Sequence, residues 1–158
     1  MKYSIKSAGL TQIVVRVCYF LLAAAVVLFP ILMRQQDGDA LYFVMIAEHG
    51  KYLIFPFYAV VPAGYAALVC LDKLLTNIKH DIVFDERNVI ILGTLMWCCL
   101  YAALVGIISY VVIALCYKSI ETVILLAFGE AFMALVIRVV RDVIKKAIEI
   151  KEDNDLVV

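Results

Sequence analysis

Apolar and polar positions divide the chain into four long hydrophobic runs separated by short polar segments. The runs cover residues 13–33, 52–72, 89–115 and 120–141. At about 1.5 Å of rise per helical residue, each run is long enough to cross a hydrocarbon core of about 30 Å. The pattern predicts an all-α polytopic membrane protein, with four transmembrane helices in an antiparallel bundle and a single membrane domain over residues 1–158.

The composition supports lipid as the solvent for most of the chain. Its 158 residues are 66% hydrophobic and 18% charged, whereas soluble domains are about 45–50% apolar. The formal net charge is zero, which argues against direct binding of nucleic acid. The cysteines lie in or at the ends of apolar runs, where a thiol behaves as a small hydrophobic group, so we expect no disulfide framework.

The polar segments indicate where the helices begin and end. Asp85 is placed to be the N-cap of the third helix, with Glu86 in its first turn. Residues 74–83 carry apolar positions at helical spacing, which predicts an amphipathic extension on the membrane surface. The connection at residues 117–119 is so short that the third and fourth helices must be antiparallel neighbours.

The basic residues predict the orientation of the chain in the membrane. Eleven of them fall on the side of the two termini, and the other three, Arg34, Lys51 and Lys118, fall on the opposite side. Loops rich in Lys and Arg stay in the cytoplasm. We therefore expect a multi-pass protein of the bacterial cytoplasmic membrane with both termini in the cytoplasm.

Glu130 is a carboxylate deep inside the fourth apolar run. It lies 11 residues before Arg141, about 16 Å from the inner end of the helix and near the middle of the core. At the same depth, Tyr65 and Tyr101 are candidate hydrogen-bond donors. A carboxyl group at this depth should face the bundle. Two interpretations stay open: a proton- or ligand-sensing group, or a buried polar tie that fixes the packing of the helices.

The third run contains two further packing signals. Ala102 and Gly106 form a small-xxx-small pair, which favours close contact with another helix. Trp97 lies well inside the run, so we expect it to pack against protein and not to anchor the helix at the interface. The run is longer than the core is thick, so it must tilt or emerge on one side.

The segment after the fourth run keeps a helical pattern, which predicts an amphipathic C-terminal extension. Apolar and charged residues fall on opposite faces of residues 138–150. Two interpretations stay open: an interfacial helix that anchors the bundle, or a docking helix for a cytoplasmic protein. The candidate partner-binding residues come from this tail and from the loop before the third helix: Arg141, Lys145, Lys146, Glu149, Glu152, Asp153, Asn154, Asp155, Arg87 and Asn88.

The sequence contains no recognisable catalytic or metal-binding arrangement. No His, Cys, Asp and Glu cluster has metal-ligand spacing, and there is no phosphate-binding loop, nucleophile elbow or catalytic triad. We predict a protein that is not an enzyme, with no cofactor and no bound metal.

Several stretches resemble a bacterial family of small four-helix membrane proteins, domain of unknown function 2975. They are residues 55–57 (FPF), 71–78 (LDKLLTNI), 83–89 (VFDERNV) and 147–156 (AIEIKEDNDL). The resemblance spans nearly the whole chain, and the tail is its most specific part. It implies a fold and a membrane location but no accepted activity. Members are often encoded beside a small helix-turn-helix regulator, which suggests a partner.

Three functions are compatible with these features. The first is a regulatory membrane protein whose inner loop and tail hold a cytoplasmic partner, such as a helix-turn-helix transcription factor. The second is a small transporter, channel subunit or immunity-type protein built around Glu130 and acting as a homo-oligomer. The third is a structural subunit of a larger membrane complex.

Overall fold

The four apolar runs form four long helices in the computed structural model, which describes residues 2–34, 50–80, 82, 84–116 and 121–155. These are α1 (Lys2–Arg34), α2 (Gly50–Lys79), α3 (Glu86–Cys116) and α4 (Glu121–Asp155). Each contains a segment that is long and apolar enough to cross a membrane. The predicted all-α class is confirmed. Residues 74–79 continue α2 without a break, so the predicted extension is the last part of the second helix and not a separate surface helix.

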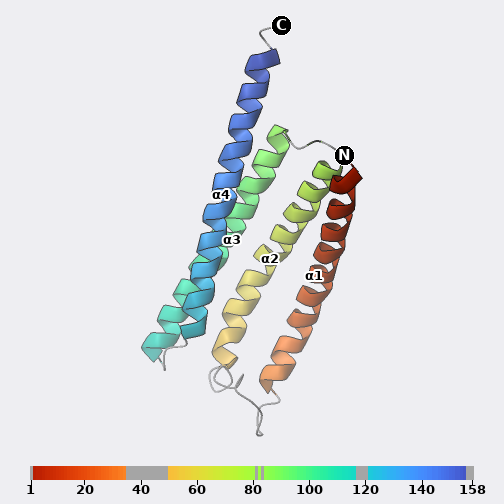
Figure 1. Cartoon of the computed structure of the whole chain (residues 1–158). Helices are drawn as coiled ribbons and strands as arrows, with labels where there is room; N and C mark the ends of the chain where they lie inside the picture. The colour runs from red at the N-terminus through yellow and green to blue at the C-terminus, as the bar shows by residue number, and fades with distance from the viewer. Residues whose placement is uncertain (1, 35–49, 81, 83, 117–120, 156–158) are drawn as a thin grey trace.

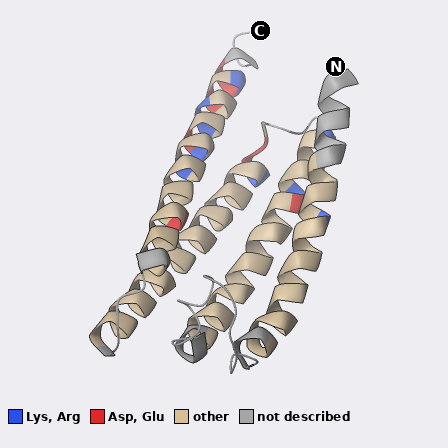
Figure 2. Cartoon of the chain, turned by 60° about the horizontal axis from the view of Figure 1, so that its bottom comes forward, with Lys and Arg blue, Asp and Glu red and all other residues tan. Residues whose placement is uncertain are grey.

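The helices lie in an open row that follows the order of the chain. In Figures 1 and 2 each helix runs antiparallel to its neighbour, with α1 and α4 at opposite edges. The main contacts are those of α1 with α2, α2 with α3, and α3 with α4, and the last of these is the most extensive. An even number of antiparallel helices brings the two termini to the same end of the row (Figure 1).

The contact between α3 and α4 is a close seam of small and aliphatic residues. A Cβ atom added at Gly106 would lie 3.0 Å from the Cβ of Ala127, so the two helices approach closely there, as the predicted packing signal requires. Ala127 and Ala134 are buried, and so is Ile137. These positions, with Glu130, follow a seven-residue repeat along α4, which keeps one face against α3.

The contact between α1 and α2 depends on aromatic residues instead. The rings of Phe29 and Phe57 stack with centroids 4.2 Å apart, and those of Tyr19 and Tyr65 lie 6.2 Å apart. The hydroxyl group of Tyr58 donates a hydrogen bond to the carbonyl oxygen of Val26 at 2.9 Å. These contacts join the outermost helix to the rest of the row.

Candidate functional site

Charged side chains of α1, α2 and α4 mark a common level near the termini, and this level falls at Gly93 on α3. The guanidinium group of Arg141 reaches Gly93, and a hydrogen bond joins Asn77 to Asn88. Because neighbouring helices are antiparallel, the Asn77–Asn88 pair also places Asp72 opposite Gly93. The contact between Tyr19 and Tyr65 places Arg16 within about one turn of the same level. In Figure 2, Lys, Arg, Asp and Glu gather towards this end of the row.

This level fits one boundary of the hydrocarbon core. Gly93 and Leu115 are 22 residues apart on α3, which corresponds to about 33 Å along the helix axis. From Arg141 back to Glu121, α4 has 20 residues, or about 30 Å. Both values match a core of about 30 Å. The extra length of α3 therefore emerges from the lipid at this end. We call the part beyond the level, residues 2–11, 73–80, 82, 84–92 and 142–155, the charged end.

Within the charged end, α4 extends further than α3. The contacts of Gly106 with Ala127 and of Gly93 with Arg141 set the alignment of the two helices. In this alignment Glu86, the first residue of α3, lies opposite about residue 148 of α4. The last seven residues of α4 therefore project beyond α3 by about 10 Å, as Figure 1 shows at the C-terminal end.

A buried asparagine fixes the turn between α2 and α3. Asn88 is 2% exposed. Its side chain accepts a hydrogen bond from Asn77 at 2.6 Å and donates one to the carbonyl oxygen of Ile82 at 2.7 Å. Asn88 therefore stabilises the turn from inside. The prediction that its side chain binds a partner is wrong, because a side chain this deeply buried is not accessible.

The predicted helix start at Asp85 is confirmed. One carboxylate oxygen of Asp85 accepts a hydrogen bond from the backbone N–H of Arg87 at 2.9 Å, as an N-cap does. The Arg87 side chain is exposed. It therefore belongs to the accessible surface of the charged end, at the start of α3.

Most of the predicted tail residues lie on the surface of α4. Lys145, Lys146, Glu149, Glu152 and Asp153 are exposed. Asn154 and Asp155 belong to the last turn of the helix, and their side chains fall outside the described residues.

Arg141 differs from these residues because it is half-buried. It lies over Gly93, with a long contact of 3.4 Å to Asp142. The structure thus brings most of the predicted tail residues together on one projecting helix, with Arg141 at its base.

Apolar side chains are exposed in the same region. Ile82 and Phe84 lie on the turn, Ile90 lies on α3, and Val143 and Ile150 lie on α4. In the membrane-spanning part of the row, exposed apolar side chains face lipid. Val143 and Ile90 lie within about one turn of the boundary, whereas Ile82, Phe84 and Ile150 lie further out, where a protein surface can cover them.

Glu130 lies in the seam between α3 and α4, where it is half-buried. Its carboxyl group lies next to the thiol group of Cys99 on α3. The structure places the two predicted donors elsewhere: Tyr101 donates to the carbonyl oxygen of Ala59 at 3.3 Å, and Tyr65 packs against Tyr19. Depth counting found the correct part of α3 but did not identify the face that points to α4.

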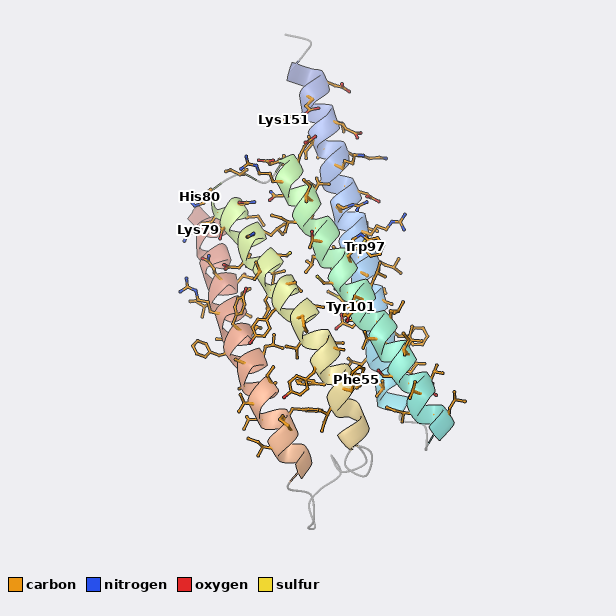
Figure 3. All side chains as sticks on the ribbon, turned by 180° about the vertical axis from the view of Figure 1, so that it is seen from behind. Phe55, Lys79, His80, Trp97, Tyr101 and Lys151 are labelled. Atoms are coloured by element: carbon orange, nitrogen blue, oxygen red, sulfur yellow. The ribbon has the colours of Figure 1, made fainter. Side chains whose placement is uncertain are left out.

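Trp97 has a different environment from the predicted one. Its side chain, labelled in Figure 3, is 67% exposed and so does not pack in the protein interior. Trp97 lies one turn from Gly93 on the core side of the boundary, about 6 Å from it along the helix. This depth is typical of interfacial tryptophan, and the expectation that it packs against protein is wrong.

Three residues of the site were not predicted. Cys99 contacts Glu130, Gly93 makes room for Arg141, and Asn77 pairs with Asn88. A signal existed only for Asn77, because two asparagines flank a short connection between long helices. The two contacts across α3 and α4 depend on the rotation of each helix, which depth alone does not determine.

The fold and the charged end define a small polytopic membrane protein with four helices of spanning length. Residues 23–158 match a family described as "Protein of unknown function (DUF2975)", and the chain belongs to this family. The resemblance seen in the sequence is thereby confirmed. Comparisons with curated proteins and with solved structures found no match.

Proposed function

We propose that this protein is a non-enzymatic regulator of the bacterial cytoplasmic membrane that holds a soluble partner at its charged end. The observation that carries the proposal is the projection of α4 beyond α3. A helix that only spans the bilayer has no need of seven further residues with exposed charges and an exposed Ile150. Such a surface fits docking of a partner protein.

The orientation follows from the distribution of basic residues. Eleven of the 14 Lys and Arg residues fall at the end of the row that carries the termini. The positive-inside rule assigns this end to the cytoplasm. The resemblance to a family encoded beside helix-turn-helix regulators favours a transcription factor as the partner, held away from DNA while it is bound.

The charge pattern of α4 indicates how a partner would be held. Lys145 and Lys146 lie near the boundary, whereas Glu149, Glu152 and Asp153 lie at the projecting tip. A DNA-binding protein presents a basic surface, and the acidic tip is complementary to it. The exposed apolar side chain of Ile150 supplies a contact that salt does not screen.

Photo-crosslinking from single positions on α4 tests this proposal. A photo-reactive amino acid at Ile150 should trap a soluble protein in living cells, and one at Leu126, which is exposed in the lipid region of the same helix, should not. Mass spectrometry identifies the adduct. Truncation after Ile148 keeps the contact of α4 with α3 and should abolish binding of the trapped protein. Identical products from both positions, or binding that survives truncation, would contradict docking at the tip.

A transporter, channel or immunity-type function built around Glu130 is the second candidate. The observation that favours it is the half-buried carboxyl group beside Cys99 in the middle of the core. An open row does not surround a central path, so this function requires several copies. A pH-dependent flux in liposomes, lost in Glu130→Gln, would support it, whereas equal flux in the two proteins would exclude a role for this carboxyl group.

A further inference from the structure

Three basic residues lie on one face of α4 where the helix leaves the lipid. Arg138, Arg141 and Lys145 are three and four residues apart, so their side chains lie above one another on the helix surface. Arg138 lies about 4.5 Å on the core side of Arg141, and Lys145 about 6 Å on the outer side. This range of depth covers the boundary between acyl chains and headgroups.

One side chain of this basic face, that of Arg141, reaches across to α3 and lies over Gly93. A Cβ atom added at Gly93 would lie 3.6 Å from a guanidinium nitrogen of Arg141 and 4.0 Å from its Cδ. The Arg141 side chain therefore crosses the seam and lies along the surface of α3. Its contact with Asp142 is 3.4 Å long and involves one nitrogen, which leaves most of its five N–H donors for other acceptors.

Trp97 lies on the same surface, one turn deeper. It follows Gly93 by four residues and therefore shares its face of α3. The indole ring is exposed at the depth of the upper acyl chains. Two arginines and a lysine thus lie on α4 at the boundary, and a tryptophan lies one turn deeper on the lipid-exposed side of α3.

We propose that this basic face of α4, with the adjoining surface of α3, binds the headgroup of an anionic phospholipid. The lipid phosphate lies against Arg138, Arg141 and Lys145, and the guanidinium groups hold it with paired N–H donors. The acyl chains follow the exposed apolar surface of α3, where Trp97 contacts their upper part. This site is independent of any soluble partner, because its residues lie at the boundary and not at the tip of α4.

The fluorescence of Trp97 measures occupancy of the site directly, because it is the only tryptophan in the chain. The protein is reconstituted in vesicles of phosphatidylcholine and phosphatidylglycerol, with one of the two lipids brominated in its acyl chains. Bromine quenches a neighbouring indole. At equal mole fraction we expect brominated phosphatidylglycerol to quench more strongly, corresponding to a preference of about fivefold or more for the anionic lipid near Trp97.

Two triple variants separate a specific site from general attraction by the positive end of the protein. Arg138→Gln, Arg141→Gln and Lys145→Gln together should bring the preference close to one. The matched control, Arg16→Gln, Lys73→Gln and Lys79→Gln, removes the same charge from α1 and α2 and should keep it. Equal quenching by both lipids in the unmodified protein, or equal loss in both variants, would overturn the proposal.

Discussion

The α3–α4 pair and the α1–α2 pair show two different ways of joining helices in lipid. The first pair packs closely, with Gly106 against Ala127 and with buried alanines along the seam. The second pair is joined by stacked aromatic rings and by one hydroxyl hydrogen bond. Lipid provides no hydrophobic force between helices, so each pair must gain stability from direct contacts. The close seam supplies more of these contacts.

The difference bears on function, because the two pairs carry different features. Glu130 and the projecting tip both belong to the tighter pair, which also contains most of the buried residues. The α1–α2 pair lies at the other edge of the row, where Val15 is the one buried side chain among those described in α1. We therefore expect α3 and α4 to form the rigid part of the molecule and α1 to be the most easily displaced helix.

The largest effect is expected from a larger side chain in the close seam between α3 and α4. Gly106→Leu would place a large side chain where a Cβ atom already meets Ala127, and should destabilise the fold by about 3 kcal/mol. The matched control is Gly129→Leu, because a Cβ atom there meets nothing within 4 Å. Reversible unfolding in detergent micelles measures both. Similar losses of stability in the two variants would contradict the difference between the close α3–α4 seam and the open side of α4 at Gly129.

The turn that joins the two pairs should show the next largest effect. Asn88→Ala removes the partner of Asn77 and of the Ile82 carbonyl group, at a cost of about 2 kcal/mol. Trypsin should then cut faster after Lys79 and after Arg87, which flank the turn. As a control, Thr94→Ala removes an exposed hydroxyl group that bonds within its own helix, and its cleavage rate should not change. Unchanged cleavage in Asn88→Ala would show that the network does not hold the turn.

The aromatic seam predicts a smaller loss. Phe57→Ala removes the ring stacked on Phe29 and should destabilise the α1–α2 contact by about 1 kcal/mol. Phe55, two residues away, is 83% exposed, so Phe55→Ala should have little effect. Unfolding in the same micelles ranks the two variants, and an equal or larger loss in Phe55→Ala would rule out stacking as the source of stability.

The single hydroxyl hydrogen bond should contribute least. Tyr58→Phe keeps the ring and removes the donor to the Val26 carbonyl group, so we expect a loss of about 0.6 kcal/mol, typical of side-chain hydrogen bonds in membranes. The same unfolding experiment measures it. A loss as large as that of Phe57→Ala would mean that the hydrogen bond, and not ring stacking, dominates this seam.

The sequence predicted the features that depend on local pattern. The four helices, the cap at Asp85 and the close approach at Gly106 follow from hydrophobic runs, from N-cap chemistry and from small-residue spacing. Each of these signals needs only a few neighbouring residues. These predictions therefore do not depend on how the helices are arranged.

The contacts between helices could not be predicted in the same way. They depend on the rotation of each helix and on the open order of the row. Depth alone placed Tyr101 and not Cys99 beside Glu130, and length alone did not show that α3 emerges at the charged end. Asn88 was read as a surface residue because its partner Asn77 lies on another helix.

The central claim is that the charged end, with both termini and the tip of α4, lies in the cytoplasm. Single-cysteine labelling tests it directly at Lys151→Cys and Lys79→Cys in a chain in which the five native cysteines are changed to Ser; this includes Cys116, which ends α3 at the opposite end of the row. A reagent that cannot cross membranes should leave both introduced thiols unlabelled in intact cells and should label both in everted vesicles. Labelling of either position in intact cells would contradict the orientation and the docking proposal that depends on it.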